Sequence, residues 1–153
     1  MTGRPAPLEP RVPWRMGMTL FSLLGALVAL YLWSFHLGLS ELVCPVKGCE
    51  VVQASAYSSL LGVPVATIGF FAFLALFTVS VSSVLIEGFE AEHLVLATTS
   101  LGLLAYLYFT YLELFVIRAI CFWCVVSSLM MLGAWLCSLV ALRQGSRPAV
   151  RGV

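Results

Sequence analysis

The chain is 153 residues long, with 61% hydrophobic and only 10% charged residues and a mean hydropathy of +1.06. This composition excludes an ordinary soluble globular protein, and the length leaves room for a single domain. The net charge of +1 gives no indication of a nucleic-acid partner. The sequence therefore predicts a small protein embedded in a membrane.

Four uncharged segments are long enough to cross a bilayer, which takes about 20 apolar residues in a helix. They are residues 16–39, 63–86, 94–112 and 119–142. Lipid offers no hydrogen-bond partners to the backbone, so each segment should satisfy its own amide groups as a helix. We therefore predict an all-α membrane protein, with residues 16–142 forming one bundle of four transmembrane helices.

The basic residues predict the orientation of the bundle. Lys47 and Arg118 lie in the two connections on one side, whereas the other six basic residues flank the first and last segments. These six are Arg4, Arg11, Arg15, Arg143, Arg147 and Arg151. The positive-inside rule then places both termini in the cytoplasm and the opposite loops outside. The proline-rich residues 1–15 should be disordered, and residues 143–153 should form a cytoplasmic tail.

The first outward loop, residues 40–62, carries a pair of cysteines, Cys44 and Cys49, with Pro45 and Gly48 between them. Such a pair can close a small disulfide ring that exchanges readily with other thiols. Outside the cytoplasmic membrane this disulfide would persist. Residues 52–61 mix apolar and hydroxyl side chains, which favours a short amphipathic helix capping the bundle.

A second pair, Cys121 and Cys124, lies near the beginning of the fourth segment. Positions three apart share one face of a helix, so both sulfurs can point the same way. In such a pair one thiolate attacks a disulfide and the other resolves the mixed disulfide that forms. The positive end of the helix dipole favours the thiolate, so we expect these cysteines to be reactive.

The remaining polar and sulfur-containing side chains carry weaker signals. Glu113 and Arg118 fall in the short outward turn, where a surface ion pair is expected, with proton handling by Glu113 as the alternative. His36 is expected to be a polar residue at headgroup level rather than a proton carrier. Cys137 lies about 20 Å beyond Cys124 along a helix, so we interpret it as a small buried residue.

Three interpretations of the four paired cysteines remain open. Two structural disulfides would add little stability, because closing such short loops removes little entropy from the unfolded chain. A zinc site would need ligands from two pairs that are separated by two membrane spans. The third interpretation is a relay, in which the exposed loop pair exchanges electrons with the helix pair at the edge of the membrane. This arrangement explains best why one pair is in a loop and the other on a helix.

The cysteines and their surroundings resemble the vitamin K epoxide reductase family in its bacterial or archaeal form. The likeness covers residues 44–128 and, in topology, all four spans. The residues that carry it are Cys44, Cys49, Ser55, Gly62, Pro64, Gly69, Cys121 and Cys124. Each motif alone is modest, but four cysteines and a serine in this order on four spans form a specific combination.

The resemblance implies a membrane thiol–disulfide oxidoreductase that supports disulfide-bond formation. Cys44 would exchange with a thioredoxin-like envelope protein, and Cys49 would pass the electrons to Cys121. Cys124 would face a quinone (ubiquinone, menaquinone or a form of vitamin K) and reduce it. Ser55 would lie over the site and hydrogen-bond near the sulfurs. Many bacterial members carry a fused thioredoxin-like domain; none follows Leu142 here, so we expect a separate partner.

Two positions depart from the animal members of the family. Ser128 replaces a tyrosine, and Val65 falls where those members have a quinone-binding asparagine. We expect these two residues and Gly69 to line the quinone pocket and to favour quinone reduction. Reduction of vitamin K epoxide is the alternative within the same enzyme class. A non-catalytic membrane scaffold braced by disulfides is the alternative from another class.

Overall fold

The structure is a computed structural model that describes residues 12–85 and 92–145 of the chain. Four of the six basic residues used to predict the cytoplasmic side lie outside the described residues. These are Arg4, Arg11, Arg147 and Arg151. The predicted disorder of residues 1–11 and most of the expected tail also lie outside them.

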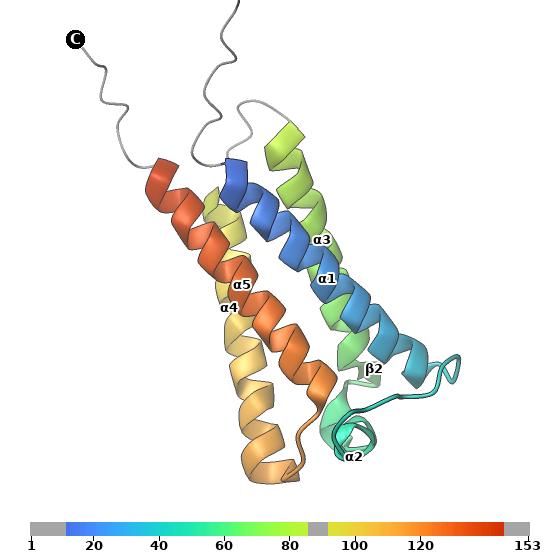
Figure 1. Cartoon of the computed structure of the whole chain (residues 1–153). Helices are drawn as coiled ribbons and strands as arrows, with labels where there is room; N and C mark the ends of the chain where they lie inside the picture. The colour runs from blue at the N-terminus through green and yellow to red at the C-terminus, as the bar shows by residue number, and fades with distance from the viewer. Residues whose placement is uncertain (1–11, 86–91, 146–153) are drawn as a thin grey trace, which may run out of the picture.

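Four long helices form the body of the molecule (Figure 1). They are α1 (Val12–His36), α3 (Val65–Leu85), α4 (Glu92–Tyr111) and α5 (Phe122–Gly145). Each contains a stretch long and apolar enough to cross a membrane. Helix α1 packs against α3 and α5, and α4 packs mainly against α5. The predicted four-helix membrane bundle is confirmed.

The bounds of α1 and α5 are both shifted by three or four residues from the predicted ones, 16–39 and 119–142. Helix α1 begins at Val12, so residues 12–15 are helical and the expectation of disorder there was wrong; Pro13 is tolerated because it lies in the first turn. The helix ends where Gly38 takes a positive φ of 69°, with the Leu39 amide donating to the Ser34 carbonyl at 3.0 Å. Glycine adopts this left-handed conformation without a steric penalty. Helix α5 runs to Gly145, three residues beyond the predicted end.

The capping segment is not the single helix predicted for residues 52–61. It consists of α2 (Cys49–Gln53), a 3-10 turn η1 (Ala56–Ser58) and a hairpin of β1 (Ser59–Leu60) with β2 (Val63–Pro64). The two turn residues, Leu61 and Gly62, both have positive φ, which favours a tight hairpin and is incompatible with a helix. The segment lies at the end of the bundle opposite the start of α1 (Figure 1).

Close packing of small residues against aromatic rings holds the helices together. A methyl group at Gly25 of α1 would lie 2.4 Å from the ring of the fully buried Phe73 of α3. A methyl group at Gly133 of α5 would lie 2.8 Å from the ring of Phe21. Small residues let membrane helices approach in this way, and dispersion contacts then stabilise the bundle.

The third membrane span was predicted to end at residue 112. Its helix, α4, is instead followed directly by a π-helical turn, η2 (Leu112–Ile117). The Ala119 amide donates to the Glu113 carbonyl at 3.1 Å, and Arg118 ends the turn with a φ of 55°. A π turn accommodates an extra residue and changes which side chains face inward. Both Leu112 and Glu113 are buried as a result.

Candidate active site

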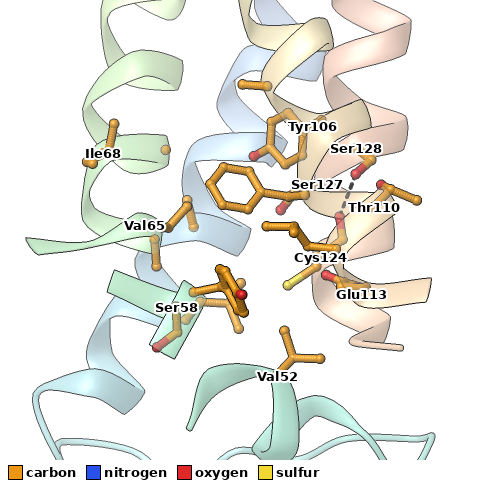
Figure 2. Close-up of a pocket in the computed structure, with 18 of the residues that line it drawn as sticks. Val52, Ser58, Val65, Ile68, Tyr106, Thr110, Glu113, Cys124, Ser127 and Ser128 are labelled. Atoms are coloured by element: carbon orange, nitrogen blue, oxygen red, sulfur yellow. Dashed lines mark hydrogen bonds between the residues drawn. The ribbon is translucent and has the colours of Figure 1, made fainter. Parts of the chain in front are cut away.

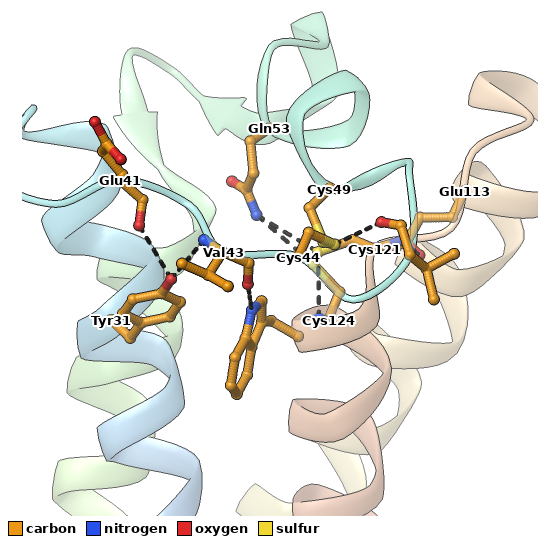
Figure 3. The surroundings of a disulfide bond; sticks show 11 residues. Tyr31, Glu41, Val43, Cys44, Cys49, Gln53, Glu113, Cys121 and Cys124 are labelled. Atoms are coloured by element: carbon orange, nitrogen blue, oxygen red, sulfur yellow. Dashed lines mark hydrogen bonds between the residues drawn. A yellow bond between two sulfur atoms is a disulfide. The ribbon is translucent and has the colours of Figure 1, made fainter.

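The four paired cysteines meet at one end of the bundle (Figure 3). Cys44 and Cys49 are joined by a disulfide, whereas Cys121 and Cys124 are free thiols. Cys49 and Cys121 are both fully buried and belong to the same apolar cluster. The loop pair is therefore oxidised and the helix pair reduced, with the inner cysteine of the loop packed in the same cluster as Cys121.

Gly48 allows the loop to approach the beginning of α5. A methyl group at Gly48 would lie 2.5 Å from the carbonyl oxygen of Ile120, the residue that precedes Cys121. The φ of Gly48 is 167°, an extended conformation open to any residue, so the requirement is for space. Two backbone segments can thus touch here, and Cys49 packs beside Cys121.

Two aromatic side chains hold the segment that leads into Cys44. Trp123 of α5 donates its indole N–H to the Val43 carbonyl at 2.9 Å. The Tyr31 hydroxyl of α1 accepts the Val43 amide at 2.9 Å and donates to the Glu41 carbonyl at 3.1 Å. The two rings lie edge to face with centroids 5.1 Å apart. Figure 3 shows this loop segment passing from the end of α1 toward the start of α5.

Cys121 is the residue immediately before α5 and caps it. Its carbonyl accepts the Val125 amide at 3.1 Å, and its sulfur accepts the Cys124 amide at 3.4 Å. An N-cap side chain ordinarily accepts a hydrogen bond in this way from the third helical residue. The predicted segment began at residue 119 and so included both cysteines, but α5 begins three residues later, at Phe122. Only Cys124 is on α5 itself.

Hydrogen bonding lowers the pKa of the Cys121 thiol below its ordinary value. The main cause is the hydrogen bond with the Cys124 side chain, helped by the Cys124 amide and Gln53. Burial and the negative charge of Glu113 act in the opposite direction but are outweighed. A lowered pKa increases the thiolate fraction near neutral pH, which makes Cys121 a suitable nucleophile or leaving group.

Gln53, on α2, points its side-chain amide at both helix-pair sulfurs. The amide nitrogen lies 3.9 Å from the sulfur of Cys121 and 3.7 Å from that of Cys124. His36, at the end of α1, lies 2.7 Å from the amide oxygen, so its Nε2–H is the donor. Ser55, which we expected near the sulfurs, instead donates to the Val52 carbonyl at 2.7 Å. The buried Gln53 takes the position predicted for Ser55.

Glu113 is buried beside the thiols, so the expected surface ion pair with Arg118 was wrong. The glutamate is only 6% exposed, and its Oε2 accepts the backbone N–H of Cys121 at 3.2 Å. Arg118 is exposed at the outer turn. The π-helical turn η2 explains the difference, because it directs Glu113 toward α5.

A largely apolar cavity of about 190 Å³ lies between the helices below the cap (Figure 2). A dry cavity of about 150 Å³ is large enough for a benzene ring, so this one can hold a flat ring. Its wall includes residues from α3, α4 and α5, among them Val65, Gly69, Tyr106, Cys124, Ser127 and Ser128. Cys124 lines the cavity and Cys121 does not.

The profile of the vitamin K epoxide reductase family matches residues 16–139, which is most of the chain. The protein belongs to the vitamin K epoxide reductase family. No curated protein matches the chain significantly. Membership and the four spans make the protein an integral, multi-pass membrane protein with a disulfide-related oxidoreductase activity. Members of the family use quinones.

The structure of this vitamin K epoxide reductase family member brings the predicted pocket residues together. Val65, Gly69 and Ser128 all line the cavity, as does Ser55. The Ser128 hydroxyl already uses its proton in a hydrogen bond to the Cys124 carbonyl oxygen at 2.9 Å. Cys137 is buried among the bundle helices, away from the other sulfurs, as predicted.

Sequence reasoning also missed polar groups that line the cavity of this family member, among them Tyr106 and Ser127. Figure 2 shows Tyr106 and Ser127 beside each other on the wall. A methyl group at Gly69 would lie 3.7 Å from the Tyr106 hydroxyl oxygen. The Ser127 hydroxyl lies near that of Tyr106 but completes no well-formed hydrogen bond among the described residues. The sequence offered one indication for Ser127, because it lies three residues after Cys124 and so shares a helix face with it.

Proposed function

We propose that the protein oxidises a thioredoxin-like protein outside the cytoplasmic membrane and passes two electrons through its cysteine pairs to a membrane quinone. The activity would support disulfide-bond formation in exported proteins. The observation that carries this proposal is the burial of Cys49 and Cys121 in one cluster, with the loop pair oxidised and the helix pair reduced.

The relay begins at Cys44, which is half-buried and therefore more accessible than the fully buried Cys49. A thiolate of the partner attacks Cys44, and the partner leaves as a disulfide while the loop pair becomes a dithiol. Cys49 then attacks Cys121 in a Cys121–Cys124 disulfide and expels the Cys124 thiolate. Attack by Cys44 on Cys49 restores the loop disulfide and leaves the helix pair as a dithiol. This final redox state is the one in the structure.

The helix dithiol is proposed to reduce a quinone in the cavity. Two electrons and two protons leave the dithiol, Cys121–Cys124 becomes a disulfide, and the quinone becomes a hydroquinone. Strongly oxidising envelope proteins have reduction potentials of about −120 mV, so the final acceptor must have a more positive reduction potential. The hydroxyls of Tyr106 and Ser127 are suited to donate hydrogen bonds to a quinone oxygen, whereas Val65 has no donor.

The sidedness follows from the charges at the two ends of the bundle. Arg15 and Arg143 belong to the end where α1 begins and α5 finishes, and Lys47 and Arg118 to the end with the cysteines. Applied to these groups, the positive-inside rule supports cytoplasmic termini and an outward thiol site.

The relay is tested by Cys124→Ala, with Cys137→Ala as a matched control from the bundle core. Without Cys124, the Cys121 thiolate attacks Cys49 in the loop disulfide and releases Cys44. Peptide mapping by mass spectrometry should find a Cys49–Cys121 disulfide, and dithiol-dependent quinone reduction should stop. Cys137→Ala should behave like the unmodified protein. Undiminished quinone reduction by Cys124→Ala would contradict the proposal, and turnover of vitamin K epoxide would favour the alternative substrate.

A further inference from the structure

Glu113 is the one buried residue with an ionisable carboxyl group in the described part of the chain. Removing a carboxylate from water is unfavourable unless other groups compensate. Among the described residues, its side chain accepts the Cys121 amide and lies beside the Cys124 thiol, and no basic side chain forms an ion pair with it. The fold thus keeps an acidic group in an unfavourable place, next to the reacting sulfurs.

The geometry links this carboxyl group to both the thiol and the cavity. Its Oε2 accepts the Cys121 backbone N–H at 3.2 Å, and the carboxyl group is close to the Cys124 thiol. Glu113 and Cys124 both line the cavity and lie next to each other in Figure 2. A group in this position can touch the thiol and a ring bound against it.

The backbone of η2 supports a functional role for this placement. Single π-helical turns within membrane or soluble helices are rare and frequently occur at functional sites. Here the turn interrupts the third span one residue before Glu113 and ends at Arg118 in the left-handed conformation. The chain therefore departs from regular helix over the turn that presents the carboxyl group to α5.

We propose that Glu113 is a catalytic acid–base that carries a proton from the Cys124 thiol to the quinone, an inference that rests on the proposed function. The carboxylate takes the thiol proton as the Cys124 thiolate forms. As the dithiol loses two electrons and becomes the Cys121–Cys124 disulfide, the carboxylic acid gives that proton to the reduced acceptor and becomes a carboxylate again. The proton of Cys121 leaves to water, and the acceptor takes its second proton from water.

The competing explanation is that Glu113 only accepts the Cys121 amide and so positions the start of α5. Glu113→Gln separates the two, because the amide oxygen still accepts that hydrogen bond but the side chain carries no proton. In a single-turnover experiment, the variant is first reduced with a dithiol and its free thiols are counted. Rapid mixing with a soluble short-chain quinone then follows reoxidation of the helix pair.

We expect Glu113→Gln to show normal thiol reduction and normal quinone affinity, with reoxidation slowed roughly 100-fold, since general acid–base groups contribute about 10²- to 10⁴-fold. Formate should restore part of the rate in Glu113→Ala, which leaves space for a small acid. Glu50→Gln, an exposed site on α2, is the control and should leave every rate unchanged. Reoxidation of Glu113→Gln at the rate of the unmodified protein would overturn the inference.

Infrared difference spectra of the unmodified protein add a test that does not depend on a variant folding or turning over. During reoxidation of the reduced helix pair by a quinone, a protonated buried carboxyl group should form transiently, seen as a carbonyl band sensitive to deuterium oxide. The band should shift in Glu113→Asp. Its absence in the unmodified protein would overturn the inference. Failure of the unmodified protein to reduce any quinone would instead refute the proposed function.

Discussion

His36 lies 2.7 Å from the side-chain oxygen of Gln53, and this contact ties the end of α1 to the short helix that covers the thiols. The hydrogen bond fixes the orientation of the amide, so its nitrogen faces the sulfurs of Cys121 and Cys124. His36 therefore acts on the sulfurs through Gln53. The first membrane helix contributes to the site without contacting the reacting atoms.

A double-mutant cycle tests this coupling. Gln53→Leu should slow the transfer from the loop pair to the helix pair about fivefold, because a modest hydrogen bond to the developing thiolate is lost. His36→Leu should have a smaller effect. The double variant should be no slower than Gln53→Leu alone, since His36 works through the amide. Stopped-flow measurement of thiol exchange provides the rates, and additive effects would contradict the coupling.

The lowered pKa of Cys121 predicts a difference between two substitutions of its neighbour. Cys124→Ser keeps a side-chain donor to the Cys121 sulfur, whereas Cys124→Ala removes it. Hydrogen bonding to the thiolate lowers the pKa, so its loss in the alanine variant should raise the pKa. Below the ordinary thiol pKa, Cys121 should then carry less thiolate and alkylate more slowly.

The measurement is the alkylation rate of Cys121 against pH in reduced protein, with the labelled peptide identified by mass spectrometry. The midpoint of the profile should lie at higher pH in Cys124→Ala than in Cys124→Ser. Identical midpoints would show that the Cys124 side chain does not influence the Cys121 thiolate.

Gly48→Ala should separate the loop pair from the helix pair. The added methyl group would meet the Ile120 carbonyl, and backbone on both sides must move to relieve the contact. A displacement of about 1 Å between reacting groups costs up to about 100-fold in rate, so exchange between Cys49 and Cys121 should fall by roughly 10- to 100-fold. The loop disulfide itself should still form.

Lys47→Ala is the control for this substitution, because Lys47 is adjacent in sequence and exposed. With a small dithiol as reductant, its relay rate should match that of the unmodified protein. Non-reducing peptide maps verify the loop disulfide in both variants. An unaffected relay in Gly48→Ala would show that the close approach is not required.

Ser127→Ala should weaken quinone binding without destabilising the protein. A buried hydroxyl lacking a good partner costs about 1–3 kcal/mol, so removing it should leave the free energy of unfolding unchanged or slightly higher. The KM for quinone should rise about fivefold because a donor to the quinone oxygen is lost. Thermal unfolding in detergent and steady-state quinone reduction measure the two effects.

Ser138→Ala is the matched serine control within the same helix. Its hydroxyl donates to the Trp135 carbonyl at 2.7 Å and lies 3.3 Å from the Thr99 hydroxyl, away from the cavity. This variant should lower the melting temperature and leave the KM unchanged. A reversed pattern between the two serine variants would place the quinone elsewhere in the bundle.

Much of the fold was predictable, because membrane spans and cysteine pairs can be recognised from residues that are close together in the sequence. Four apolar segments of bilayer length determine four helices, since an unpaired backbone is too costly in lipid. The spacing of Cys44 and Cys49 and of Cys121 and Cys124 marked two cysteine pairs without any structure, and the fold brings these pairs together. The order of these motifs was also enough to place the chain in its family.

Only the tertiary structure decided which polar side chains surround the sulfurs. Glu113 looked like a surface residue because it follows an apolar span, but the π-helical turn buries it beside Cys121. Gln53, rather than Ser55, reaches the thiols because the cap folds as a short helix and a hairpin. Hydropathy and spacing report on neighbours along the chain, whereas burial and hydrogen bonding depend on segments that meet only when the helices pack.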